Sequence, residues 1–213
     1  MDKKRVASIY KKLTELYPDV TTALKYENPL ELLFATILSA QCTDVRVNKV
    51  TAVLFKKYRK IKDYASADLK EFEQDIRSTG FYHNKAKNII AAAKMIEKDF
   101  NGKVPDTMDE LVKLPGVARK TANIVLFHSY GKNDGIAVDT HVKRLSGRLG
   151  LTQYDDPVKI EEDLMSIFDR DKWGYLSNLL IEHGRAVCDA RKPLCAECKL
   201  CDLCPSAGKA VAR

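Results

Sequence analysis

Apolar residues recur along most of this chain at intervals of three and four positions, the spacing that gathers them on one face of an α-helix. Such stripes predict helices over residues 6–16, 29–38, 47–58, 69–76, 84–98 and 173–187. Residues 107–129 carry a helical pattern that a short turn interrupts. No segment alternates convincingly between apolar and polar residues, as a half-buried strand would. We therefore expect an all-α protein.

Residues that favour helix ends lie at the borders of several stripes. Asn28 precedes Pro29 and Glu31, an arrangement typical of an N-cap, a first-turn proline and a carboxylate at the third helical position. Asp156-Pro157 predicts the start of another helix, while Gly80 and Asn101-Gly102 are typical of helix ends. The loop of residues 131–135 is the expected hinge between two helical units, and the first helix is compatible with either unit.

The composition indicates a soluble globular protein, with 45% hydrophobic and 31% charged residues among 213. The strongest apolar run, residues 32–38, is too short to span a bilayer. The N-terminus lacks the apolar core of a secretory signal. We therefore expect a cytoplasmic protein, associated with the nucleoid.

The charge of the chain favours a polyanionic partner, because the net charge is +7 and the pI is about 9.0. Most of the excess lies in the second half of the sequence. Residues 111–148 hold seven Lys or Arg against two Asp, and residues 183–213 hold six against three acidic residues. A solvated basic surface would give the same counts, so the charge alone leaves both interpretations open.

Five of the six cysteines lie between residues 188 and 204, which in a cytoplasmic chain points to a metal site rather than disulfides. The spacing Cys188-x6-Cys195-x2-Cys198-x5-Cys204 offers four thiolates, which suit zinc and an iron–sulfur cluster equally well. Cys201 creates a second possible register that begins at Cys195 and resembles a ferredoxin pattern. Cys42 is expected to be a buried small apolar residue.

The segment 114–122, LPGVARKTA, joins two helical patterns by a short turn at Pro115-Gly116, and the second helix is expected to begin near Arg119. Backbone amides in such a turn, and at the start of the following helix, can bind a phosphate without reading bases. The segment resembles the helix–hairpin–helix motif of DNA-repair glycosylases, which implies that Gly116, Ala118 and Arg119 bind DNA. That family usually has glycine where Ala118 stands, so alanine would be strained if the turn required a positive φ there.

Residues 136–142, IAVDTHV, follow the hairpin, and together the two segments resemble the catalytic half of the endonuclease III family. By that resemblance Lys120 is the nucleophile and Asp139 its carboxylate partner. An amine can attack the sugar C1′, expel the base and hold the opened sugar as a Schiff base, after which β-elimination breaks the strand. A carboxylate can stabilise the cationic sugar and move protons. Asp139 could equally cap the helix that runs through Val142 and Leu145.

The same resemblance assigns a [4Fe-4S] cluster to Cys188, Cys195, Cys198 and Cys204, and leaves Cys201 as a bystander. It implies that a cluster here has a structural role and presents Arg191 and Lys192 to the DNA backbone. It also implies that Gln41 and Phe81 enter the duplex when a base is flipped out. Phe81 replaces the family's common leucine, and Tyr82 and His83 are close enough to compete for that role.

As a whole the resemblance implies two helical domains, a six-helix domain over 22–132 with the hairpin and a second domain of 1–21 plus 133–213 with the cluster. The implied activity is base-excision repair of oxidised pyrimidines in double-stranded DNA or of abasic sites, by a monomer. An adenine-specific glycosylase of the same superfamily is disfavoured by Lys120. A non-catalytic DNA-binding module with a zinc site is the alternative from another class.

Overall fold

The computed structural model of the protein describes residues 2–208, so Lys209 and Arg213, which contribute to the basic excess, lie outside the described residues. Within the described range every regular element is helical, which confirms the predicted all-α fold. The chain divides into two compact units, Thr22–Lys132 on the one hand and Met1–Thr21 with Asn133–Arg213 on the other. Each helix of residues 2–208 falls short of the length and apolar character that crossing a bilayer requires.

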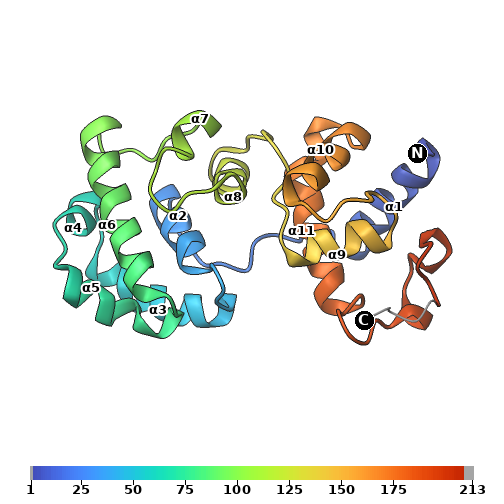
Figure 1. Cartoon of the computed structure of the whole chain (residues 1–213), viewed down its shortest axis with the longest axis horizontal. Helices are drawn as coiled ribbons and strands as arrows, with labels where there is room; N and C mark the ends of the chain where they lie inside the picture. Colours follow the sequence, from blue (N-terminus) through green and yellow to red (C-terminus); the bar gives the residue numbers. More distant parts are fainter. Residues whose placement is uncertain (1, 209–213) are drawn as a thin grey trace. The chain divides into compact units, whose positions relative to one another are not determined.

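The unit Thr22–Lys132 is built around the longest of its helices, α6 (Figure 1). Its helices are α2 (Pro29–Leu38), α3 (Asp44–Lys57), α4 (Ile61–Ala65), α5 (Leu69–Ile76), the 3-10 turn η1 (Arg77–Thr79), α6 (Tyr82–Asp99), α7 (Met108–Leu111) and α8 (Arg119–Tyr130). Helices α4 and α5 pack against α6, and α2 packs against α8. The apolar run of residues 32–38 is buried throughout, so α2 supplies the centre of this core.

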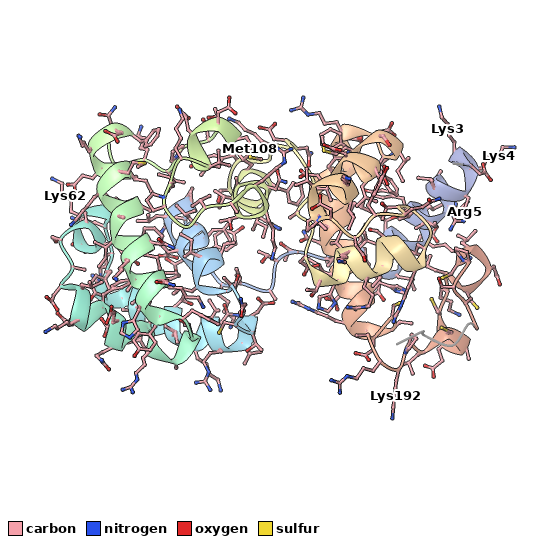
Figure 2. All side chains as sticks on the ribbon, in the orientation of Figure 1. Lys3, Lys4, Arg5, Lys62, Met108 and Lys192 are labelled. Carbon is pink, nitrogen blue, oxygen red and sulfur yellow. The ribbon has the colours of Figure 1, made fainter. Side chains whose placement is uncertain are left out.

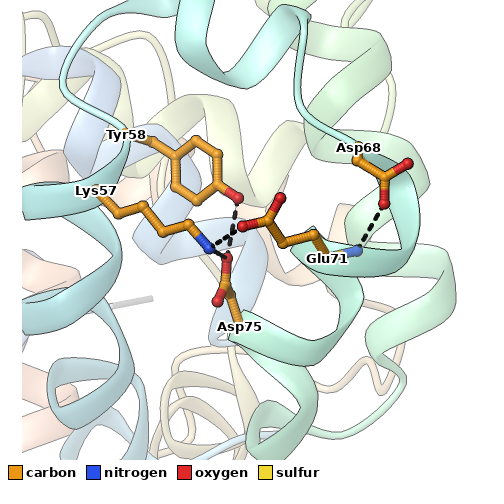
Figure 3. A network of polar contacts seen from close by, with 5 residues as sticks. All are labelled: Lys57, Tyr58, Asp68, Glu71 and Asp75. Carbon is orange, nitrogen blue, oxygen red and sulfur yellow. Dashed lines mark hydrogen bonds and ion pairs between the residues drawn. The ribbon is translucent and has the colours of Figure 1, made fainter.

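A network of polar side chains joins the end of α3 to α5 (Figure 3). The Lys57 amine lies 2.8 Å from Glu71 Oε1 and 2.6 Å from Asp75 Oδ2, and the Tyr58 hydroxyl donates to the same Asp75 oxygen at 2.9 Å. Burial, followed by the hydrogen bond with Asp75, raises the pKa of Tyr58 to about 12. Asp68 caps α5 by accepting from the Glu71 amide at 2.9 Å. The network fixes α5, which leads directly into η1 and α6.

The second unit is centred on α11, against which both α1 and α9 pack (Figure 1). Its helices are α1 (Lys3–Leu16), α9 (Thr140–Arg148), α10 (Pro157–Ile167), η2 (Arg170–Lys172), α11 (Trp173–Ala186), η3 (Cys195–Glu197) and η4 (Cys201–Leu203). The core includes fully buried residues from both ends of the sequence, among them Ile9, Leu13, Leu176, Leu179 and Leu180.

Helix α1 also holds the cysteine-rich C-terminal loop in place. Arg5, labelled in Figure 2, donates from Nε to the Leu203 carbonyl at 3.0 Å and from Nη2 to the Leu149 carbonyl. The Lys12 amine donates to the Lys199 carbonyl at 3.0 Å. The N-terminal helix is therefore part of the same unit as the cysteines.

The predicted helix starts agree with the structure. Asn28 Oδ1 accepts from the Glu31 amide at 3.0 Å at the start of α2, and Asp156 accepts from the Val158 and Lys159 amides at the start of α10. Two expectations require correction. Helix α4 was not predicted, and α7 ends at Leu111, several residues before Pro115. Tighter turns continue the chain to the proline, with the Lys113 amide donating to the Glu110 carbonyl and the Leu114 amide to the Leu111 carbonyl, both at 3.1 Å.

Candidate functional site

The hairpin between α7 and α8 is a tight turn that only glycine can complete at its third position. The Val117 amide donates to the Leu114 carbonyl at 3.1 Å, and Gly116 has φ +80°, as the third residue of a type II turn requires. A Cβ on Gly116 would also lie 2.9 Å from Cβ of Asn88 on α6. Glycine at this position thus serves both the turn and the close approach of the hairpin to α6.

Ala118 adopts an extended conformation, with φ −89° and ψ 168°, at the N-cap of α8. Alanine accepts that conformation without strain, so the departure from glycine costs the turn nothing. Its side chain has no oxygen that could accept from the first amides of α8, which is the arrangement that leaves helix amides for an external acceptor. The structure thus answers the question that the sequence raised about Ala118.

Lys120 is the second residue of α8, next to Arg119, and both side chains are exposed. The helix is held in the core by Ala122, Val125 and Leu126, which are fully buried. The hairpin therefore carries its two exposed basic side chains at the start of a helix whose opposite face is fixed.

Asp139 belongs to the other unit, where it caps α9. Its Oδ1 accepts from the His141 and Val142 amides, both at 2.8 Å, as an N-cap residue does. Within residues 2–208 the second carboxylate oxygen, Oδ2, takes no hydrogen bond. The capping role is therefore real, and it uses only one of the two oxygens.

Gln41 and Phe81 share an unusual backbone conformation. They are two of the three non-glycine residues with positive φ in the described chain, at 53° and 49°, and both are exposed. The third is Asn101, a residue type that tolerates this region well. Strained residues of this kind persist only where the surrounding structure holds them, and they are concentrated at functional sites.

The three neighbouring rings at the start of α6 differ clearly in their surroundings. Phe81 is 63% exposed, whereas Tyr82 packs against the core of its unit. His83 Nδ1 lies 2.9 Å from Glu73 Oε2 on α5. Of the three candidates for insertion into the duplex, Phe81 is the one whose ring is exposed, makes no ion pair and does not pack against the core.

The cysteines at the C-terminal end line one cavity of about 300 Å³, together with Leu145, His183 and Leu194. All five clustered cysteines contribute to its wall, including Cys201. No group of three or more His, Cys, Asp or Glu in residues 2–208 is arranged for a single metal ion. A cavity lined by five cysteines is consistent with an iron–sulfur cofactor, because cysteine thiolates are the usual ligands of such clusters.

Hydrogen bonds reach three of these sulfurs from α9 and α11. Arg148 Nη1 donates to Cys188 Sγ at 3.2 Å, Cys204 Sγ donates to the Arg148 carbonyl at 3.4 Å, and Cys198 Sγ lies 3.4 Å from His183 Nε2. Burial raises the pKa of Cys198, and the charges of Cys188, Cys204 and Cys195 raise it further. Contacts with α9 and α11 thus help to hold the sulfurs of Cys188, Cys198 and Cys204.

The backbone of the loop between Cys188 and Cys195 is held by two side chains, those of Asp189 and Arg148. Asp189 Oδ1 accepts from the amides of Arg191 and Lys192 at 2.8 and 3.1 Å, and Arg148 donates to the carbonyls of Asp189 and Ala190, both at 2.7 Å. The side chains of Arg191 and Lys192 are exposed, and Figure 2 shows Lys192 extending away from the ribbon. The loop therefore presents two cations from a fixed backbone.

Three residues were not singled out from the sequence: Arg148 and His183 beside the cysteines, and Lys85, whose amine donates to the carbonyls of Leu38 and Thr79 near Gln41 and Phe81. Each bonds to groups far along the chain, so no local pattern marks them. For Lys85, the one available signal was a lysine within an alanine-rich helix. The sequence does not show whether a lysine at a single position is buried, so this signal could not be used. Cys42 also differs from expectation, because it is half-buried rather than fully buried.

Comparison with known proteins identifies the family. The family model of the HhH-GPD superfamily base excision DNA repair proteins matches residues 34–170. Endonuclease III of Synechocystis sp. is 56% identical over 205 residues, covering 96% of this chain and 94% of that protein. A structure of a non-covalent endonuclease III–DNA complex has a TM-score of 0.92 at 45% identity, and a structure of a trapped endonuclease III–DNA covalent intermediate has 0.93 at 45%, each covering 97% of both chains. The chain therefore belongs to the HhH-GPD superfamily of base excision DNA repair proteins, as a bifunctional glycosylase and abasic-site lyase of the endonuclease III family.

Proposed function

We propose that this chain removes oxidised pyrimidines from double-stranded DNA, with Lys120 as the nucleophile. The Nζ lone pair attacks the sugar C1′, and the bond between C1′ and the base breaks, so that the base leaves with the bonding electrons and takes up a proton. Breaking the bond from C1′ to the ring oxygen then gives an iminium between the sugar and Lys120.

The iminium prepares the second reaction, cleavage of the strand. It acidifies C2′, and when a base removes the C2′ proton, the electrons form a C–C double bond and expel the 3′ phosphate. Asp139 is the residue we assign to stabilising the cationic sugar and moving protons, through its unbonded Oδ2. Its Oδ1 meanwhile keeps α9 capped.

The observation that carries this proposal is the exposed amine of Lys120 in the first turn of α8, directly after the hairpin. The test is incubation with duplex DNA carrying one ring-saturated thymine in the presence of borohydride, which reduces a Schiff base to a stable bond. Peptide mapping of the trapped adduct should place the sugar on Lys120. An adduct on any other residue would contradict the assignment.

We assign DNA binding to four parts of the chain. The hairpin at Gly116, Ala118 and Arg119 would hold a phosphate, and the loop with Arg191 and Lys192 would bind the backbone. Gln41 and Phe81 would fill the stack where a base has been flipped out. The two endonuclease III structures named above are complexes with DNA, which supports a DNA partner for this chain.

The cysteine-lined cavity would hold a [4Fe-4S] cluster through Cys188, Cys195, Cys198 and Cys204. These four cysteines line the cavity together with Cys201, and thiolates are the usual ligands of such a cluster. When bound, the cluster would crosslink the end of α11 to the C-terminal loop through iron–sulfur bonds. Its role would be to fix that loop and its two exposed cations.

Replacing Asp139 by asparagine should separate its two roles. Asparagine caps helices about as well as aspartate, so α9 should remain intact, while the negative charge is lost. We expect single-turnover base release to slow by about 10²- to 10⁴-fold, the range for loss of a group that transfers protons.

Asp156→Asn is the matched control, because Asp156 caps α10 in the same unit through the same kind of bonds. Both variants should unfold at nearly the same denaturant concentration as the parent, and Asp156→Asn should keep full activity. Equal activity of the two variants would remove Asp139 from the chemistry.

The loop cations predict a change in salt dependence. DNA affinity should fall steeply with salt, because bound lysines and arginines release condensed counterions. In the double variant Arg191→Ala with Lys192→Ala, the slope of log K against log salt should flatten by about one unit for each phosphate that the loop no longer binds. A double variant with alanine at the exposed Lys62 and Lys70 loses the same charge elsewhere and should keep the parent slope. An unchanged slope in the loop variant would show that the loop does not touch the backbone.

A further inference from the structure

Lys85 is a buried lysine in a helix whose other lysines are exposed. It lies in the first turn of α6, and only 5% of its surface is exposed. Lysine is almost never buried to this extent without partners, because its amine must be removed from water. The partners of this amine therefore indicate what the residue is for.

Those partners are two carbonyls at the ends of other helical elements. Lys85 Nζ donates to the carbonyl of Leu38, the last residue of α2, at 2.8 Å, and to the carbonyl of Thr79, the last residue of η1, at 2.9 Å. The last carbonyls of a helix have no donor within the helix, and a cation there is favoured by the helix dipole. One amine thus satisfies and joins two helix ends that are 41 residues apart in the sequence.

Each of these carbonyls is followed closely by Gln41 or Phe81, two of the three non-glycine residues with positive φ in the described chain. Gln41 comes three residues after Leu38, and Phe81 comes two residues after Thr79. The backbone amide of Lys85 also donates to the Phe81 carbonyl, at 3.1 Å. The Lys85 amine therefore holds the chain just before Gln41 and just before Phe81, and its backbone makes the first helical bond after Phe81.

We propose that Lys85 is a positioning residue for base flipping, which holds the segments that carry Gln41 and Phe81 in fixed relation to each other. This inference rests on the proposed insertion of those two side chains into duplex DNA. Two side chains that fill the gap left by one flipped base must be correctly placed relative to each other. A misplacement of about 1 Å can lower the rate about 10²-fold. The Lys85 amine bonds to the start of both segments and so fixes their relative position.

The test uses Lys85→Met, which keeps an unbranched side chain one atom shorter than lysine and removes all three donors. Its activity is compared on two substrates: a duplex carrying one ring-saturated thymine, and a single strand carrying an abasic site. Only the duplex has a stack to fill after flipping. We expect the single-turnover rate on the duplex to fall by about 10- to 100-fold, while cleavage of the single strand stays near the parent rate.

Lys94→Met is the matched control, because Lys94 is an exposed lysine of the same helix. It should retain both rates. A merely structural role for Lys85 predicts that both rates fall together in Lys85→Met, and that result would overturn the proposal. If Lys85→Met does not fold, Lys85→Gln takes its place, because glutamine keeps a donor on a shorter side chain. The quantity compared is again the ratio of the rate on the duplex to the rate on the single strand.

Gln41→Ala and Phe81→Ala distinguish this inference from the function on which it rests. Both should reproduce the loss that is specific to the duplex. If they do and Lys85→Met does not, only the role of Lys85 is wrong. If neither alanine variant loses activity on the duplex, the insertion of Gln41 and Phe81 is itself wrong.

Discussion

Lys120→Ala is expected to abolish base release, strand cleavage and borohydride trapping together. One amine performs the attack on C1′ and then carries the Schiff base, so its loss removes both reactions rather than one. Removal of a covalent nucleophile typically lowers the rate by at least about 10³-fold. A variant that lost strand cleavage alone would instead point to base removal by activated water.

The fold and DNA binding should survive this substitution. Alanine is the best helix former, and Lys120 is exposed on a helix that Ala122, Val125 and Leu126 hold in the core. Phosphate contacts would come from backbone amides of the hairpin and from other basic residues. Binding is measured by fluorescence anisotropy with a duplex that carries a non-cleavable abasic analogue.

Lys113→Ala provides the comparison for charge. Lys113 is exposed and precedes the same hairpin, so its loss changes the net charge equally. This variant should still form the trapped adduct. Wild-type levels of adduct in Lys120→Ala would show that another amine is the nucleophile.

Much of the fold could be predicted because the signals are local in sequence. An N-cap residue bonds to amides two or three positions ahead, so Asn28, Asp139 and Asp156 act where the pattern placed them. Helix α4 was missed because five residues are too few to form a periodic stripe. Helix α7 stops several residues before Pro115 because tighter turns replace it there, and an apolar pattern does not distinguish such turns from α-helix.

The candidate site could be predicted less completely, because its supporting contacts are distant in sequence. Lys85 bonds to a carbonyl 47 residues away, and Arg148 bonds to a sulfur 40 residues away. Backbone conformation was equally unreadable: the sequence raised a question of strain at Ala118, where none exists, and gave no sign of it at Gln41 and Phe81. Residue type indicates a role in chemistry, but not the shape of the backbone that carries it.

The cysteine variants should divide clearly between Cys188 and Cys201. Cys188→Ser is expected to lose or destabilise the iron–sulfur cluster, because a hard hydroxyl is a poor replacement for a soft thiolate. Cys201→Ser is expected to keep the brown colour and the content of iron and sulfide. Both residues line the same cavity, so position alone does not distinguish them and both variants are needed.

The contacts of Cys188 are the reason for expecting this outcome. Its amide donates to the His183 carbonyl at 2.8 Å, directly after α11 ends, so a ligand there ties that helix to the C-terminal loop. Its sulfur accepts from Arg148 Nη1 at 3.2 Å. The register through Cys201 would leave α11 without this tie and place four ligands within ten residues.

Iron and sulfide analysis of the two purified variants decides between the registers. In the ferredoxin-like register the results exchange, so that Cys201→Ser loses the cluster and Cys188→Ser retains it. A colourless parent protein that contains zinc would contradict both registers as iron–sulfur sites. Cys42→Ser, in the other unit, controls for the general effect of losing a thiol and should retain full iron.

Loss of iron in Cys188→Ser should also weaken the binding of DNA by Arg191 and Lys192, because the loop that presents them would lose its crosslink to α11.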